Sequence, residues 1–221
     1  MTSGSEPLTV EGSACPVPLR HDERIVMGHG SGGRMMHDLI VRCFLSALDN
    51  PVLRAGDDAG VVEIEGVRLA VSTDSHVVAP LFFPGGDIGR LAVCGTVNDV
   101  AMKGATPLYL TAGFVLEEGL EVDVLARALA SMRAASDEAG VQIVAGDTKV
   151  VERGKGDGLY VNTAGVGLVR PGAAIGGAMA RPGDIVIVSG TIGDHGIAVL
   201  AARGDLGFET AVESDVAPLN H

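Results

Sequence analysis

Five aspartates in this chain share a setting in which a carboxylate could do chemistry. They are Asp57, Asp58, Asp74, Asp99 and Asp147. Most of them follow a short run typical of a β-strand and precede a small residue or a turn, and α/β sheets gather their ligands at strand ends. Carboxylates that meet there with hydroxyl and amide oxygens suit a hard, oxygen-preferring ion such as Mg²⁺. Those further oxygens would come from Thr73, Asn98 and Thr148. Paired aspartates are common in turns, so the predicted metal site depends on the repeated pattern and not on any one residue.

One stretch, Ser72 to Pro107, is expected to hold the element around which this site is built. Gly85-Gly86-Asp87 predicts a turn and a helix N-cap, and apolar residues then recur at helical spacing. Asn98 and Asp99 fall on or beside the inward face of this helix, where a carboxylate is costly to bury unless a cation or hydrogen-bond donors meet it. The alternative is that both residues are simply the polar end of the helix.

Two further features could bind phosphate. Lys149 lies two residues past Asp147 and could neutralise phosphate charge, although a solvated surface lysine is the ordinary alternative. Gly28–Arg34 is a glycine-rich stretch whose backbone N–H groups could approach a phosphate, and a mobile linker explains it equally well. It is not a P-loop, because the Gly-Lys-Ser/Thr ending is missing.

Composition narrows the classes of function. The 221 residues carry a formal net charge of −12, which argues against binding nucleic acid or an anionic membrane face. An acidic protein that binds ATP needs a cation such as Mg²⁺ between the charges. The three cysteines are widely spaced and form no CxxC motif, so a disulfide framework or zinc site is not expected. The N-terminus lacks the features of a signal peptide and no segment is long and apolar enough to span a bilayer, so we expect a cytoplasmic protein.

The pattern of apolar residues predicts an α/β protein. Residues 1–24 are typical of a flexible tail, residues 25–170 predict an N-terminal domain, and residues 171–221 predict the start of an incomplete C-terminal domain. One strand and one helix in that last part are too little to close a core. We expect helices at 35–48, 88–102, 122–139 and 197–203, and strands at 61–64, 67–74, 108–116, 141–144, 159–169 and 184–189.

Six motifs together resemble one known family. They are HGSGGRMM (29–36), DDAGVV (57–62), STDSHVVAPLFFPGGDIG (72–89), GTVNDVAMKGATP (95–107), GDTKVV (146–151) and SGTIGDHG (189–196). The chain resembles the HypE family, the carbamoyl dehydratases of nickel–iron hydrogenase maturation, over nearly all of residues 25–221. That family belongs to the superfamily of aminoimidazole ribonucleotide synthetase, selenophosphate synthetase and thiamine monophosphate kinase. The scattered aspartates alone would indicate only the superfamily.

The resemblance implies a two-domain, synthetase-like fold in which the N-terminal domain forms a shared β-barrel in a homodimer, with ATP and Mg²⁺ in a cleft beside it. HypE-like proteins receive a carbamoyl group on a C-terminal cysteine from the carbamoyltransferase HypF. ATP then activates the carbamoyl oxygen, loss of phosphate leaves a thiocyanate, and the cyanide passes to iron on a HypC–HypD scaffold.

The resemblance also assigns residues by matching motif positions. The residues expected to bind Mg²⁺-ATP are Asp57, Asp58, Asp74, Asn98, Asp99, Gly146, Asp147, Thr148 and Lys149. Among them the metal ligands would be Asp57, Asp58, Asp74, Asp99 and Asp147. Asp74 and Lys149 would be catalytic, with Lys149 on the phosphates.

One departure from the family pattern bears on activity. HypE proteins continue past the point where this chain ends and finish in a modifiable cysteine, whose position is not that of Cys15, Cys43 or Cys94. We therefore expect a truncated form that folds and dimerises but does not complete the dehydration. Two alternatives stay open: another ATP-dependent small-molecule kinase or synthetase of the superfamily, and a non-catalytic dimerisation module. The PLFFPGGDIG run (80–89) favours the HypE family over the first alternative.

Overall fold

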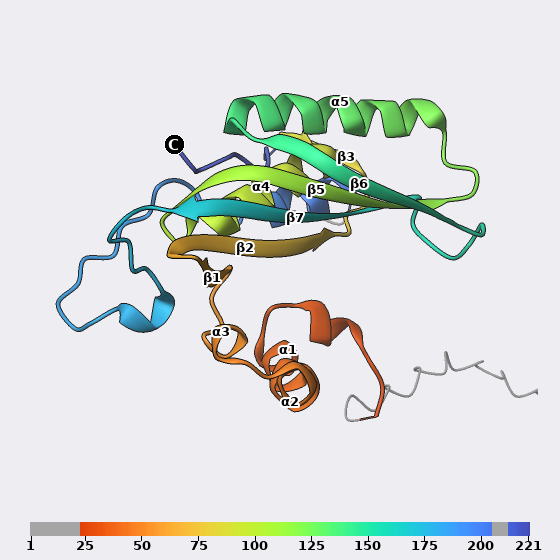
Figure 1. Cartoon of the computed structure of the whole chain (residues 1–221). Coiled ribbons are helices and arrows are strands. Elements are labelled where there is room, and N and C mark those ends of the chain that lie inside the picture. Colours follow the sequence, from red (N-terminus) through yellow and green to blue (C-terminus); the bar gives the residue numbers. More distant parts are fainter. Residues whose placement is uncertain (1–22, 205–211) are drawn as a thin grey trace, which may run out of the picture. The chain divides into compact units, whose positions relative to one another are not determined.

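A computed structural model describes residues 23–204 and 212–221 of the chain (Figure 1). The chain divides into two compact units, residues 1–50 and residues 51–221. The tail predicted at residues 1–24 lies outside the described residues, except for its last two positions. The domain boundary predicted near residue 171 stays a prediction.

The first unit is helical where it is described. A short 3-10 turn at Met27–Gly30 (η1) precedes helix α1 at Arg34–Leu39, a π-helical stretch at Ile40–Leu45 (η2) and α2 at Ser46–Leu48. These last three join into one continuous helical run, which confirms the helix predicted after Gly33. Its end at Asp49 agrees with the Asp-Asn-Pro sequence that follows, because proline disfavours helical conformation in the residue before it.

The second unit is built on a five-stranded sheet with the order β1-β2-β7-β5-β6. Its strands are β1 Gly60–Ile64, β2 Val67–His76, β5 Ala105–Glu117, β6 Gln142–Val151 and β7 Leu159–Val169. Neighbouring strands are antiparallel except β5 and β6, since helix α5 at Val122–Ala139 carries the chain across between them. The remaining elements are α3 Pro51–Arg54, β3 Phe82–Phe83, β4 Gly86–Asp87, α4 Ile88–Ala101, η3 Gly177–Met179 and α6 Asp194–Ala202.

Local sequence explains where these elements begin and end. Glu65 and Gly66 both have positive φ, which suits the tight turn between β1 and β2. The Asp87 carboxylate caps α4 by accepting hydrogen bonds from the backbone N–H groups of Gly89 and Arg90, at 2.7 and 3.1 Å. Gly140 ends α5 in the left-handed conformation, as the sequence predicted.

Helices α4 and α5 pack on the same face of this sheet, and the core lies between the helices and the strands (Figure 1). The inward side chains of α4 and α5 meet those of β5 and β7 there. The fully buried large residues are Ile88, Val93, Val97, Val100, Leu110, Met132, Leu159 and Val161. The other face of the sheet carries alternate residues of the same strands, and these are more exposed.

Two predicted strands need correction. β6 does not end near Val144 but continues to Val151, because it pairs with β5 along its whole length. Residues 184–189 do not form a strand, and Ile185, Val186 and Ile187 are 85–90% exposed. An apolar strand needs neighbours on the sheet, and the described residues supply none to this segment. Across residues 23–204 and 212–221, none of the helices has the length and apolarity needed to span a lipid bilayer.

Candidate functional site

Three of the predicted carboxylates come together where β2 meets α4: Asp58 before β1, Asp74 on β2 and Asp99 on α4. The hydroxyl of Ser72 lies 2.9 Å from Asp99 Oδ2 and 3.1 Å from the carbonyl oxygen of Asp58. The pKa of Asp99 is raised to about 6, mainly by burial, while the Ser72 hydrogen bond lowers it and the carboxylates of Asp74 and Asp58 add to the rise. Within the described residues, no side chain forms an ion pair with Asp99. The cluster therefore gathers like charges without a cation to balance them.

Asp74 lies against α4 with its carboxylate 42% exposed to solvent. A Cβ atom on Gly95 would stand 3.0 Å from Asp74 Oδ2, so a glycine at this point of α4 makes room for the carboxylate. His76 is buried, its Nε2 lies 3.5 Å from Asp74 Oδ2, and burial lowers the pKa of the imidazole. The ring is therefore neutral at neutral pH and adds no positive charge to the cluster.

Two other residues predicted to bind Mg²⁺-ATP, Asp147 and Lys149, lie on the opposite face of the sheet. Asp74 pairs in register with Thr163, whose hydroxyl donates to the carbonyl of Ala92 on α4, so Asp74 belongs to the helix-covered face. Asp147 pairs in register with Gly113, the residue of β5 that follows the partner of Thr163, so the Asp147 side chain points to the other face of the sheet.

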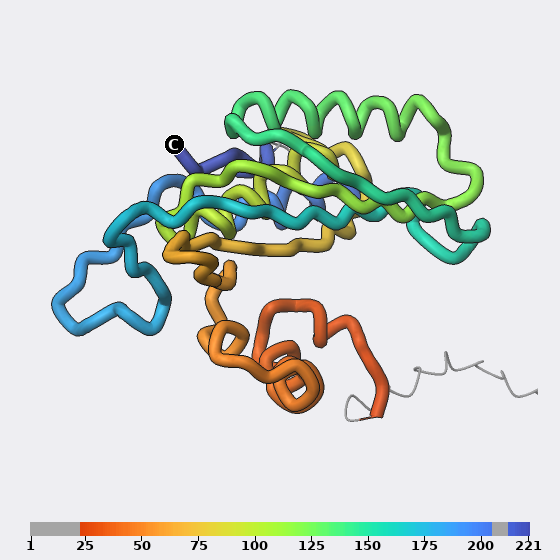
Figure 2. The backbone as a smooth tube through the Cα atoms, viewed as in Figure 1, coloured from red at the N-terminus to blue at the C-terminus, as the bar shows by residue number. Residues whose placement is uncertain are grey.

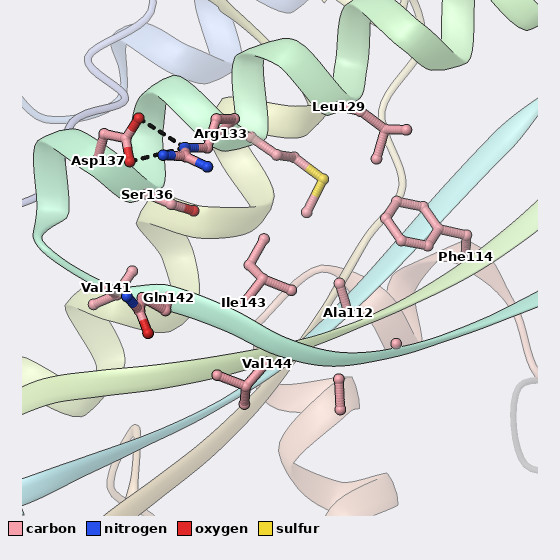
Figure 3. Close-up of a pocket in the computed structure, with 13 residues that line it drawn as sticks. Ala112, Phe114, Leu129, Arg133, Ser136, Asp137, Val141, Gln142, Ile143 and Val144 are labelled. Carbon is pink, nitrogen blue, oxygen red and sulfur yellow. Dashed lines mark hydrogen bonds and ion pairs between the residues drawn. The ribbon is translucent and has the colours of Figure 1, made fainter.

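A β-bulge decides this orientation. Leu110 pairs with Ile143, but the next residue of β5, Thr111, pairs with Ala145, so Val144 is an extra residue in β6. Figure 3 shows Ile143 pointing toward α5 and Val144 pointing to the other side of the strand. Without the extra residue, Asp147 would face α4 with Asp74.

On this open face Asp147 is already neutralised. Lys149 Nζ lies 2.5 Å from Asp147 Oδ2, and the lysine holds the pKa of the carboxyl below its usual range. Both side chains are about two-thirds exposed. They line a cavity of about 220 Å³ together with Ser75, Asn162 and Tyr160.

Asp57 and Asn98 make contacts away from the carboxylate cluster. Asp57 forms an ion pair with Lys103, at 2.6 Å, and accepts a hydrogen bond from the backbone N–H of Gly177. Lys103 also donates to the carbonyl of Ile175, so this pair fastens the chain that follows β7. Asn98 binds backbone groups of the C-terminal residues through both ends of its amide.

A cavity of about 620 Å³ lies between α5 and β6 (Figure 3). It is lined mainly by apolar side chains, with Arg133 and Asp137 paired at its edge. Of the predicted residues, Gly146 lines it, and the carboxylate cluster does not. Thr148 is an exposed residue of β6 between Asp147 and Lys149.

A magnesium ion fits the carboxylate cluster only in part. Within residues 23–204 and 212–221, no three histidine, cysteine or acidic side chains are close enough to hold a metal ion by themselves. Magnesium is usually held by one or two carboxylates together with substrate phosphates and water, so an incomplete protein ligand set agrees with a metal–nucleotide complex. The raised pKa of Asp99 and the absence of a paired cation in the described cluster are the observations that favour a divalent ion there.

Sequence reasoning missed Ser72 and Lys103. Ser72 is the hydroxyl that joins Asp58 to Asp99, and its position on the inward side of an alternating strand was the available signal. Lys103 is the ion-pair partner of Asp57 and directly follows an apolar helix, where it resembles an ordinary C-terminal lysine.

Comparison with known proteins decides the family. The family model for AIR synthase related protein, N-terminal domain, matches residues 56–169, which is just over half of the chain. The chain belongs to this family. Within it, the carbamoyl dehydratase HypE of Cupriavidus necator is 56% identical over 198 residues, covering 89% of this chain and 56% of that protein. The match confirms the resemblance to HypE proteins predicted from the motifs.

Solved structures agree. A HypE–HypF complex contains a chain with 55% identity and a TM-score of 0.78, covering 82% of this chain and 59% of that one. A HypE protein in complex with ATP has 53% identity and a TM-score of 0.67, covering 89% of this chain and 58% of that one. The mixed α/β, synthetase-like fold predicted from the sequence is thereby confirmed. This chain spans a little under three-fifths of the length of these relatives.

Proposed function

We propose that this chain is the ATP-binding part of a HypE-type carbamoyl dehydratase, which uses ATP to convert a carbamoylated C-terminal cysteine into a thiocyanate and so supplies cyanide to the iron of nickel–iron hydrogenase. One observation carries the proposal: the carboxylates of Asp58, Asp74 and Asp99 meet beside α4, and the described part of the chain supplies no cation to balance them. They do so in a chain 56% identical to a carbamoyl dehydratase HypE. A HypE protein solved in complex with ATP supports the proposal that the nucleotide is ATP.

The proposed reaction is a phosphoryl transfer followed by an elimination. The γ-phosphoryl group moves from ATP to the carbamoyl oxygen, the bond to the β-phosphate oxygen breaks, and ADP leaves. Phosphate then departs with that oxygen, both nitrogen-bound protons are lost over the two steps, and a C≡N bond remains on the cysteine sulfur. Such a reaction asks the protein mainly for positioning and neutralisation of charge.

The residues of this chain would divide that work between the two sheet faces. Asp58, Asp74 and Asp99 would hold magnesium with the phosphates as further ligands, and the metal would balance their charge. Asp147 and Lys149 cannot reach the same phosphates from the opposite face of their own sheet. We infer that Gly146–Lys149 serve a site completed by a second copy of the chain.

The open face of the sheet supports pairing with a second copy. Val71, Tyr109 and Leu168 lie on it and are 44–47% exposed, and adjacent exposed apolar side chains of this size often mark an interface. A shared β-barrel in a homodimer would cover them. HypF is the proposed donor of the carbamoyl group, supported by the solved HypE–HypF complex. A HypC–HypD acceptor and a cytoplasmic location follow from the proposed role.

Calorimetric titration of the 221-residue chain with ATP, in Mg²⁺ and in EDTA, tests the proposal. We expect binding that requires Mg²⁺ and that weakens at least tenfold, about 1.4 kcal/mol, in Asp74→Asn, because a charged metal ligand is lost. Asp123→Asn is the matched control, since Asp123 is exposed in the first turn of α5. No binding, or binding indifferent to Asp74→Asn, would favour a non-catalytic dimerisation module instead.

A further inference from the structure

Residues 212–221, here called the C-terminal segment, run across the β3–β4 hairpin and along α4 (Figure 2). The backbone N–H of Ser214 donates to the carbonyl of Pro84, at 2.9 Å. Arg90 Nε on α4 donates to the carbonyl of Val216, at 3.1 Å, and the Val216 side chain packs against the main core. The segment is therefore fixed to the second unit at several points, although it has no regular secondary structure.

The hairpin beneath the segment is shaped to receive it. A Cβ atom on Gly85 would stand 2.6 Å from the backbone nitrogen of Ser214, and one on Gly86 would stand 2.8 Å from Val216 Cγ1. Real Cβ atoms do not approach other atoms so closely, and the first of these contacts is with backbone. The close passage of the C-terminal segment thus favours glycine at both positions of the PLFFPGGDIG motif, in addition to the positive φ of Gly85 and the contact of Gly86 with Phe83.

Asn98 makes the central attachment. Its Nδ2 donates to the carbonyl of Ala217, at 2.9 Å, and its Oδ1 accepts from the backbone N–H of Leu219, at 2.7 Å. The side-chain amide thus pairs with the segment as a peptide group pairs with a neighbouring strand. An aspartate at this position could accept but not donate, and its charge would face the Ala217 carbonyl. The requirement for both a donor and an acceptor explains an asparagine next to Asp99.

The segment in turn holds His195 at the start of α6. The backbone N–H of His195 donates to Asp215 Oδ1, at 3.0 Å, and its Nδ1 lies 3.1 Å from Ser214 Oγ. The ring meets Phe83 edge-on, with 5.1 Å between ring centroids. His195 is also close enough to His76, the neighbour of Asp74, to influence its pKa.

We propose that Asn98 is a positioning residue: its amide fastens the C-terminal segment to α4 and through that segment holds His195 beside Phe83, so that it is not a ligand of magnesium or of the nucleotide. This inference refines the site of the proposed function but rests on contacts that exist whether or not the chain binds ATP. It separates Asn98 from Asp99, which the sequence placed in one site.

Hydrogen exchange of the 221-residue chain, followed by mass spectrometry, tests the attachment. Asn98→Ala removes both hydrogen bonds, and Asn98→Asp removes the donor while keeping an oxygen. We expect the amides of the C-terminal segment to exchange on the order of tenfold faster in both variants. Amides of β7 and of the middle of α4 should exchange as in the unsubstituted chain, which shows that the variants fold. Asn162→Ala is the matched control, because the Asn162 amide donates to the backbone carbonyl of Asp74 and to the Ser75 hydroxyl and not to the segment.

A second readout separates positioning from metal binding. The NMR signal of the His195 ring should shift in both Asn98 variants and not in Asn162→Ala, because release of the segment removes its Ser214 partner. The ratio of ATP affinities with and without Mg²⁺ should stay within about threefold of the unsubstituted chain in Asn98→Ala. Unchanged exchange of the segment in Asn98→Ala would overturn the inference. So would a loss of Mg²⁺ dependence in Asn98→Ala that Asn98→Asp restores, since that is the behaviour of a metal ligand. If the unsubstituted chain does not bind ATP, the proposed function fails while the exchange and NMR results still decide this inference.

Discussion

Asp99 and Asp147 are chemically identical side chains on opposite sides of one sheet, and their surroundings set them in opposite states. Asp99 lies on α4, where burial and two neighbouring carboxylates raise its pKa to about 6. Asp147 lies on the open face, where Lys149 lowers its pKa. The first carboxylate lacks a cation within the described residues, and the second already has one.

The difference teaches that an acidic residue beside the sheet is not by itself a metal ligand. Each carboxylate must be judged by the charge that surrounds it and by the face on which it lies. Asp57 belongs with Asp147 by this measure, because Lys103 pairs with it and lowers its pKa. The metal site proposed for this chain is therefore centred on Asp58, Asp74 and Asp99, with the remaining ligands supplied from elsewhere.

The largest expected effect tests whether one sheet face is packed and the other open. Gly167→Ala places a Cβ atom 2.5 Å from Val100 Cγ1 and 2.7 Å from the backbone oxygen of Thr106, so we expect a loss of about 3 kcal/mol or more in the free energy of unfolding. Ala164→Val adds atoms to the opposite face of the same strand and should cost less than about 1 kcal/mol. Chemical denaturation measures both. Equal costs would mean that the two faces do not differ in packing.

The next test asks whether a second copy covers the open face. Leu168→Glu places a charge among the exposed apolar residues there, and we expect self-association to weaken on the order of a hundredfold, about 2.7 kcal/mol, because the charge would be buried on pairing. Leu129→Glu is the control, since Leu129 is similarly exposed, at 43%, but lies on α5. Sedimentation at several concentrations measures association. A chain that is monomeric without any substitution would refute the proposed homodimer.

Much of the fold follows from local signals in the sequence. The bounds of α5 and β7 were predicted correctly, because an apolar stripe closed by Gly140 and a long alternating run are each complete within a few residues. The Asp87 cap and the turn at Glu65–Gly66 were confirmed for the same reason. These features depend on near neighbours in the chain, which a single sequence displays.

The site was harder to predict because it depends on register and on distant partners. One extra residue, Val144, turns Asp147 away from Asp74, and a shift of one residue in a strand exchanges its two faces. The partners of Asp57 and Asn98 lie 46 or more positions away. No local sequence pattern predicts a contact between residues so far apart in the chain. The apolar run at 184–189 misled prediction in the opposite way, since its composition favours a strand for which the described residues provide no neighbour.

The smallest effect compares the two aspartates directly, by the sign of the change of stability with pH. The folded-state pKa of Asp99, about 6, exceeds the ordinary value of an unfolded aspartate. Between roughly pH 4 and pH 6 the folded state therefore holds a proton that the unfolded state has lost, and this residue makes stability fall as pH rises. Asn at this position can still accept from Ser72, so Asp99→Asn should flatten that fall and stabilise the chain at pH 7 by about 0.5 kcal/mol, a small value because the group is half-exposed and screened.

Asp147→Asn should act with the opposite sign. Its folded-state pKa lies below the ordinary value, so the carboxylate stabilises the chain above the unfolded pKa and this contribution is lost as pH falls through the folded pKa. The substitution should slightly destabilise the chain at pH 7 and make no difference at the most acid pH where the chain stays folded. Denaturation in EDTA at pH 4, 5, 6 and 7 measures both variants without any bound metal. Slopes of the same sign would mean that the two faces do not impose different charge environments. In a separate measurement, adding Mg²⁺ with ATP should reverse only the stabilisation by Asp99→Asn, because only that carboxylate is proposed to hold the ion in its own chain.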